Sequence, residues 1–276
     1  MALPKPGQKP AESTPSQPVQ APARKKVITK APAFIRATSE VKQRLILNIQ
    51  GTEGSGKDHM ALEYDRGPIY VHSFDQGLEG VVQKFQNKRE IYTAEYELTI
   101  QPGEASDKDV GEAANVLWEQ FVSNYRDSLA STRTEGMVMI DTGTEVWELL
   151  RLASFGKLTQ VMPHHYSKPN AEFRDLVREG YDATNVVWLH KMVDVWENYT
   201  DSKGQEKGRK TGEKGYKGMS DIPFLVQGNV QTWMETKPEG GATFQCTILD
   251  KYRLNPDIIG LTIDNNFNTL LEITFM

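Results

Sequence analysis

The sequence contains a single cysteine, Cys246, which excludes an intramolecular disulfide and a zinc site built from cysteines. No run of eighteen apolar residues is present, and the first residues lack the apolar segment of a secretory signal. These absences predict a soluble, cytoplasmic protein. With 38% apolar residues among 276, the chain can form a real core, as one large domain or two small ones.

Positive charge is scarce outside the first 44 residues. These carry nine Lys or Arg against two acids, a net +7, whereas the remaining 232 residues carry 23 against 35, a net −12. A strongly acidic body argues against a surface that binds nucleic acid everywhere, so any such contact must be local. Residues 1–36 are rich in Pro, Gln, Ala and Ser, which predicts a disordered basic tail before a domain over 37–276.

One sequence pattern has residue types and a spacing that fit a single class of ligand. The apolar run from Leu45 to Ile49 predicts a buried strand, and a G-x-x-x-x-G-K loop and a helical segment follow it. Such a loop turns several backbone N–H groups, a helix N-terminus and a lysine toward phosphate. This predicts a nucleoside triphosphate, ATP, bound by Gly51, Thr52, Glu53, Gly54, Ser55, Gly56, Lys57, Asp58 and His59. The alternative is a glycine-rich turn without a ligand.

Asp58 departs from the pattern, which has Ser or Thr after the lysine to hold Mg²⁺. A carboxylate also binds Mg²⁺, but it repels the phosphates unless the ion or Lys57 compensates. Asp58 therefore leaves the rate of hydrolysis open.

Three further strands are predicted to end in polar residues, and the carboxyl ends of parallel strands meet at one edge of a sheet. Asp75 follows Ile69–Phe74 and is a candidate to orient water, or a plain turn residue. Asp141 ends Met137–Ile140 and is predicted to join Asp58 at Mg²⁺. His190 ends Asn185–Leu189 and is either a γ-phosphate sensor or a structural histidine.

The segment Asp201–Gly218 has six Lys or Arg, three acids and five glycines, which predicts a flexible basic loop or a hairpin tip. It is either solvated or a local contact for a DNA backbone. Residues 231–236 and 243–249 alternate around a turn and predict an antiparallel hairpin. Lys251 and Arg253 follow it on one face of a strand and are either a surface pair or a contact with a neighbouring subunit's phosphates.

In this order, these features resemble the RecA-like ATPases, in particular a small phage-encoded group with recombination and single-strand-annealing ATPases. The resemblance covers about residues 42–276 and implies a RecA-like P-loop core: α/β, with a mainly parallel central sheet, helices on both faces and a C-terminal antiparallel hairpin. It further implies a homo-oligomer in the cytoplasm of the host cell, with Lys251 and Arg253 acting between subunits. Single-stranded DNA would be bound by the basic loop, at Lys203, Lys207, Arg209, Lys210 and Lys214.

The first hypothesis is thus a Mg²⁺-dependent ATPase of phage DNA recombination, repair or replication, with the N-terminal tail recruiting a phage or host protein. The second is a nucleotide-binding scaffold in which Asp58 marks a slow or inactive site. A small-molecule kinase shares the loop but needs an acceptor site and a lid.

Overall fold

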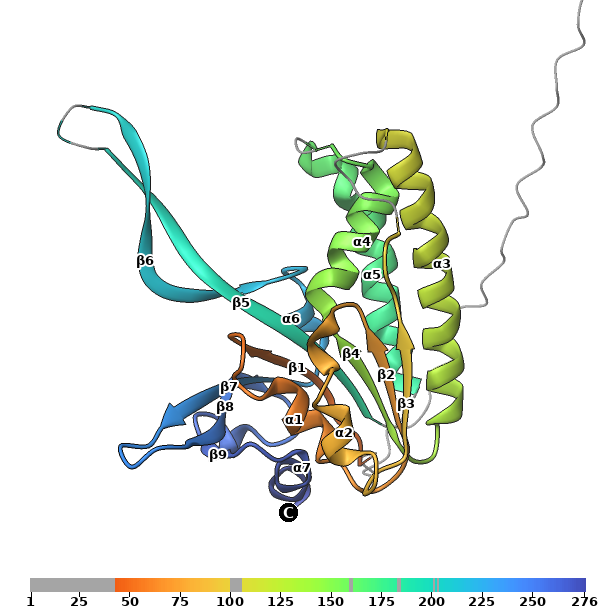
Figure 1. The fold of residues 1–276 in the computed structure, drawn as a ribbon, viewed down its shortest axis with the longest axis vertical. Helices are drawn as coiled ribbons and strands as arrows, with labels where there is room; N and C mark the ends of the chain where they lie inside the picture. The colour runs from red at the N-terminus through yellow and green to blue at the C-terminus, as the bar shows by residue number, and fades with distance from the viewer. Residues whose placement is uncertain (1–42, 100–105, 159–160, 183–184, 201, 203) are drawn as a thin grey trace, which may run out of the picture. The chain divides into compact units, whose positions relative to one another are not determined.

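The computed structural model describes residues 43–99, 106–158, 161–182, 185–200, 202 and 204–276. The tail predicted over residues 1–36 lies outside this range. Over the described residues the chain is an α/β protein with a mainly parallel central sheet and antiparallel C-terminal strands (Figure 1). The predicted fold class is confirmed at this level.

The described residues contain nine strands in one sheet, in the order β3-β2-β4-β5-β1-β7-β8-β9, and β6 pairs with β5. The neighbours from β3 to β7 are parallel, whereas the β7–β8, β8–β9 and β5–β6 pairs are antiparallel. The bounds are β1 (Ile46–Gly51), β2 (Ile69–Ser73), β3 (Ile91–Glu95), β4 (Met137–Asp141), β5 (Asn185–Thr200), β6 (Glu206–Lys217), β7 (Gly228–Thr236), β8 (Ala242–Tyr252) and β9 (Thr262–Asp264).

Helices cover both faces of the sheet because the central strands are apolar on both. Along β5, Val187 and Leu189 join the core under α1, α2 and α7, whereas Val186 and Trp188 join the core under α3, α4 and α5. Within the described ranges, no helix is long and apolar enough to cross a membrane. The helices are α1 (Lys57–Leu62), α2 (Val82–Phe85), α3 (Asp107–Ser131), α4 (Gly143–Phe155), α5 (Ser167–Glu179), α6 (Ile222–Leu225) and α7 (Phe267–Phe275).

The strand order brings distant residues to one edge of the sheet. Gly51 at the end of β1 pairs with Lys191 of β5, and Asp141 at the end of β4 pairs with Leu189 of the same strand. Asp141 also pairs with Ser73, the last residue of β2. The loop after β1, Asp141 at the end of β4 and the residues after β2 therefore lie at the carboxyl edge of the parallel strands, where open α/β sheets place ligands.

Of the two alternatives for residues 201–218, a flexible loop or the tip of a hairpin, the structure shows a hairpin: Glu206–Lys217 is strand β6 and not a flexible loop. This strand pairs with the outer part of β5, and the two extend beyond the sheet as a two-stranded arm (Figure 1). Strand β6 has almost no apolar residues because the arm has no core. Its backbone groups are paired across the ribbon instead, and Glu197 lies directly opposite Arg209.

Candidate functional site

The loop between β1 and α1 depends on glycines at positions that other residues adopt only with strain. Gly54 and Gly56 have φ angles of +70° and +86°. At Gly51, a Cβ atom would lie 2.2 Å from Ser55 Oγ and 2.4 Å from Thr232 Oγ1. The chain therefore turns tightly at the end of β1, as a phosphate-binding loop requires.

Contacts from the C-terminal strands hold this loop. Ser55 Oγ and Thr232 Oγ1 share a hydrogen bond of 2.8 Å, and Asn265 Nδ2 donates to the Gly56 carbonyl at 2.7 Å. Lys57 is buried, and its Nζ donates to the Thr52 carbonyl at 3.0 Å. The lysine ammonium thus lies over the loop itself, where it can move to a phosphate oxygen.

The structure brings Asp58, Asp75 and Asp141 close enough to repel one another. Burial, followed by the charges of Asp58 and Asp75, raises the pKa of Asp141 to about 8, against the opposing effect of Lys57 and Lys191. Burial also raises the pKa of Asp58; Lys57 opposes this, and Asp75 adds to it. The site thus concentrates carboxyl groups that a bound cation would hold in the ionised form.

Mg²⁺ fits these groups. Asp141 is buried, and its Oδ2 has no hydrogen-bond partner among the described residues. Across the described part of the chain, no three His, Cys, Asp or Glu side chains are grouped so as to hold a metal ion by themselves. Mg²⁺ commonly takes only one or two carboxylates and completes its shell with phosphate and water. Asp141 and Asp58 are suited to that arrangement.

Lys191 is a charged residue of this site that the sequence did not indicate. Its Nζ lies 3.2 Å from Asp75 Oδ2 and 2.8 Å from Oε1 of Glu145, in the first turn of α4. Burial disfavours its charged form, but these two carboxylates outweigh burial and raise the pKa of Lys191. Lys191 lies on the same face as Leu189 and next to Gly51, so its charge is placed where it would meet an anion bound at the loop.

The structure does not bring His190 to the loop, contrary to the prediction of a phosphate sensor. Its ring is fully buried on the opposite face of the sheet, where Nδ1 lies 2.8 Å from Asn48 Oδ1 and the ring packs near Tyr216. Burial lowers the pKa of His190 to about 3, so its ring is neutral. Successive strand residues point to opposite faces, so Lys191 faces the site and His190 does not.

Lys251 and Arg253 lie away from the loop of their own chain. Tyr252, between them, pairs with Gly228, and Gly228 pairs with Leu47 near the start of β1. Tyr252 therefore lies at the end of the parallel strands opposite to Gly51. Lys251 Nζ and Arg253 Nη2 donate to the carbonyls of Pro223 and Phe224, each at 2.6 Å. Contact with phosphate would therefore need a second subunit.

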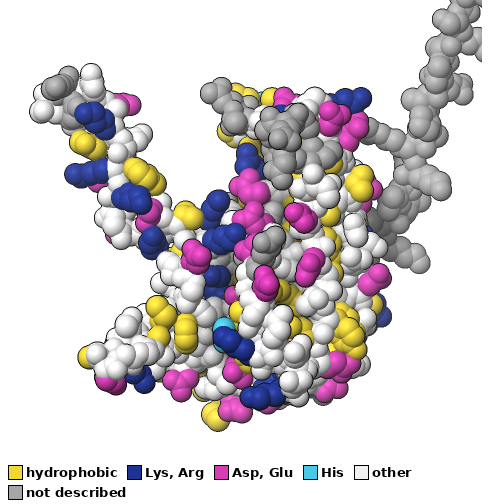
Figure 2. All heavy atoms as spheres, viewed as in Figure 1, with side chains coloured by type: hydrophobic (Ala, Val, Ile, Leu, Met, Phe, Trp, Pro, Cys, Tyr) yellow, Lys and Arg dark blue, Asp and Glu magenta, His cyan; other side chains and the backbone are white. Residues whose placement is uncertain are grey.

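The described cations of the predicted DNA-binding set lie on the arm, whereas Lys203 lies outside the described residues. Arg209 pairs with Glu197 at 2.6 Å, and Lys210 and Lys214 both pair with Asp194. Exposed apolar side chains lie along the same arm as these ion pairs and Lys207. Figure 2 shows the basic and the hydrophobic side chains together along the arm. Strand β6 carries five Lys or Arg and two acids, and residues 192–200 of β5 add two acids and no cation, so β5 offsets most of the positive charge predicted for the loop.

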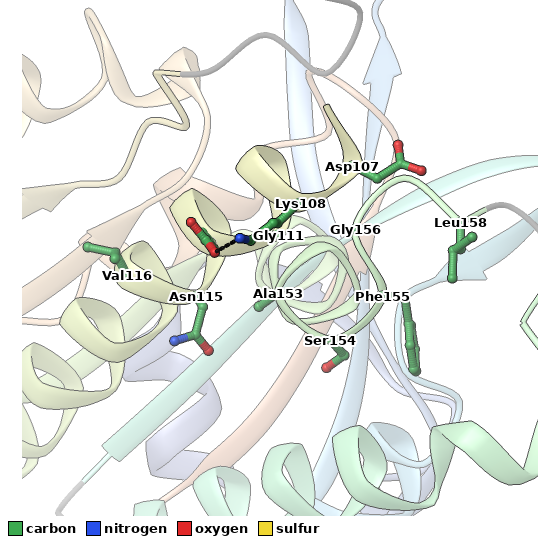
Figure 3. Close-up of a pocket in the computed structure, with 11 residues that line it drawn as sticks. Asp107, Lys108, Gly111, Asn115, Val116, Ala153, Ser154, Phe155, Gly156 and Leu158 are labelled. Carbon is green, nitrogen blue, oxygen red and sulfur yellow. Dashed lines mark ion pairs between the residues drawn. The ribbon is translucent and has the colours of Figure 1, made fainter. Parts of the chain in front are cut away.

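Two of the pockets differ in their relation to the predicted site. One of about 880 Å³ adjoins Asp75 and is lined by Ser73, Phe74, Glu79 and Tyr96, among others. Another of about 720 Å³ lies between the start of α3 and the end of α4 (Figure 3). The second is separated from Asp141 by the length of α4, roughly 20 Å for its thirteen residues. It contains none of the predicted site residues.

Neither a protein-family model nor the sequence of a curated protein matches this chain. Among solved structures, it is similar to a prototypical ATPase from the type III secretion system of pathogenic bacteria, with a TM-score of 0.36, 12% identity, and 71% of this chain and 52% of that chain covered. It is also similar to a unique ATP synthase subunit from Nanoarcheaum equitans, with a TM-score of 0.38, 10% identity, and 71% and 46% covered. The chain thus spans about half the length of these two proteins, and at such TM-scores neither likeness bears on its function.

Proposed function

We propose that this protein is a RecA-like P-loop ATPase that binds ATP with Mg²⁺ and hydrolyses it. The observation that carries the proposal is that β1 and β4 end at the same side of the sheet. The loop that contains Lys57 follows β1, and the buried carboxylate of Asp141 lies at the end of β4. One strand, β5, separates them and supplies Lys191. This arrangement offers cations and a metal-binding carboxylate to one triphosphate.

Each group has a distinct role in this proposal. Lys57 neutralises the β and γ phosphates, and Lys191 neutralises the γ-phosphate from the β5 side. Asp141 and Asp58 would hold Mg²⁺, which would supply positive charge to the phosphates. Asp75 accepts a hydrogen bond from the attacking water, since it follows β2 at the same edge.

Asp75 is held by Lys191 at 3.2 Å when no phosphate competes for that lysine. A γ-phosphate that attracts Lys191 would weaken this ion pair and leave the carboxylate of Asp75 to the water. Binding of the triphosphate and alignment of the water are therefore linked through one side chain.

Binding of ATP by the full chain with Mg²⁺, measured by calorimetry, tests the proposal. We expect Lys57→Ala to weaken binding by at least tenfold, because the charge on the outer phosphates is then unbalanced. Lys108→Ala, which removes an exposed lysine of α3, is the control and should bind as the native chain does. Equal affinity of the native chain and Lys57→Ala would refute the assignment of the loop.

A nucleotide-binding scaffold is the second candidate, because the carboxyl group of Asp58 occupies the position of the usual hydroxyl and is crowded by Asp75. Phosphate release at background level with ATP and Mg²⁺, with and without single-stranded DNA, would favour it. A gain of turnover in Asp58→Thr would identify Asp58 as the cause.

We further propose that the arm contacts single-stranded DNA during phage recombination, repair or replication. Support comes from Trp196, which is 61% exposed, beside the cation of Lys210 at 5.6 Å from its ring. Bases stack on such rings with little sequence preference. If Trp196→Ala leaves the affinity for an oligonucleotide unchanged, this part of the proposal fails.

The proposed assembly is a homo-oligomer with ATP between subunits, where Lys251 or Arg253 of one subunit reaches the phosphates of the next. The N-terminal tail would recruit a phage or host protein. Arg253→Ala should reduce hydrolysis in the assembly and leave ATP binding by isolated subunits unchanged. An equal loss of binding by isolated subunits would contradict action between subunits.

A further inference from the structure

The two sides of the phosphate loop differ in chemistry. On the side of β5, β4 and β2 stand the charged residues Lys191, Asp141 and Asp75. On the other side, β7 and β8 carry apolar side chains that are partly exposed, with Met234 at 49% and Phe244 at 38%. A nucleotide is divided in the same way, with a charged phosphate chain at one end and a flat, largely apolar base at the other.

Phe244 lies against the loop itself. A Cβ atom on Gly56 would be 2.9 Å from Phe244 Cδ1, so the ring edge is in contact with the loop backbone. The backbone of Phe244 is also tied to the loop through Asn265, whose N–H donates to the Phe244 carbonyl at 3.2 Å and whose Nδ2 donates to the Gly56 carbonyl. The backbone of Phe244 is therefore held beside the loop, and its ring lies against Gly56.

Two neighbours lie beside this ring. The ring of His59, in α1, is parallel to it within 2°, with the centroids 6.2 Å apart. Met234 is directly opposite Phe244 in the β7–β8 pair, which places both side chains on one face. Burial, followed by Lys84, lowers the pKa of His59, so its ring is neutral at pH 7 and adds no charge. The three side chains form an uncharged surface suited to an aromatic ring.

We propose that Phe244, with Met234 and His59 beside it, is the stacking surface for the base of the bound nucleoside triphosphate. The inference rests on the proposed function, since it assigns the base end of the same ligand. With the phosphates directed toward Lys191 and Asp141, the base lies on the β7–β8 side of the loop. Because two side chains from adjacent strands widen the surface, a purine gains more contact than a pyrimidine.

The test compares ATP with inorganic tripolyphosphate, which has the phosphates but no base. Binding of both to the full chain with Mg²⁺ is measured by calorimetry for the native protein, Phe244→Ala and Phe244→Tyr. We expect Phe244→Ala to weaken ATP binding on the order of tenfold, the usual loss for one stacked base, and to leave tripolyphosphate unchanged. Phe244→Tyr keeps the ring and should retain ATP affinity.

Phe224→Ala is the matched control, because it removes a phenyl ring that is 70% exposed on α6, away from the loop. Retention of full ATP affinity in Phe244→Ala, or an equal loss for ATP and tripolyphosphate, would overturn the stacking surface. If Lys57→Ala still weakens the binding of both ATP and tripolyphosphate in that case, the proposed function stands without the stacking surface. If neither ligand binds the native chain, both proposals fall together.

Discussion

Replacing Asp141 by asparagine should stabilise the ligand-free protein, and increasingly so at high pH. The pKa of this buried carboxyl group rises from an ordinary value of 3.8 to about 8 in the folded chain. Between these values the folded state holds a proton that the unfolded state has lost, so stability falls as pH rises through this window. Asparagine has nearly the same shape and no charge to lose.

The magnitude follows from the pKa difference. Each pH unit inside the window costs about 1.4 kcal/mol, so the step from pH 5 to pH 8 costs at most about 4 kcal/mol. Asp58 and Asp141 repel each other when both are ionised, so their titrations are linked, and the site can relax when both ionise. We therefore expect about half of this ceiling, roughly 2 kcal/mol.

The assay is urea denaturation of the native chain and Asp141→Asn at pH 5 and pH 8, with a chelator and without nucleotide. Comparing the two proteins at each pH removes the effect of His72 and His190, whose buried neutral rings lower stability only as pH falls below 6.5. Asp65→Asn changes an exposed carboxyl group and is the control. A stability difference between native and Asp141→Asn that is the same at both pH values would refute the reasoning.

Three other perturbations test neighbouring features. Lys191→Met should reduce the preference for ATP over ADP about tenfold, measured as a ratio of affinities, because the γ-phosphate loses a cation. Asp194→Ala should strengthen binding of an oligonucleotide at low salt, since it frees Lys210 and Lys214; unchanged affinity would exclude the arm's lysines from that contact. Gly51→Ala should destabilise the fold by about 1–3 kcal/mol in urea denaturation, because its Cβ would meet the Ser55 hydroxyl at 2.2 Å; a neutral effect would contradict the tight turn.

Local sequence determined the features that a short stretch of chain decides alone. The apolar runs over β1 and β4 are buried strands in the structure, and the loop after β1 has glycines where φ is positive. The alternating residues around Pro238–Gly241 do form the β7–β8 hairpin. Each depends on steric limits or burial within a few neighbouring residues, so their pattern is readable without the fold.

Tertiary structure decided which side chains share a site. The sequence shows polar residues directly after the apolar run Asn185–Leu189 of β5, but whether His190 or Lys191 meets the loop depends on which face α1 covers. The strength of repulsion at Asp141 depends on Asp58 and Asp75, which only the strand order brings near it. The charge of the arm was misjudged for the same reason, because Asp194 and Glu197 come from the paired strand. Phe244 reaches Gly56 through pairing across the sheet, and no local pattern carries that contact.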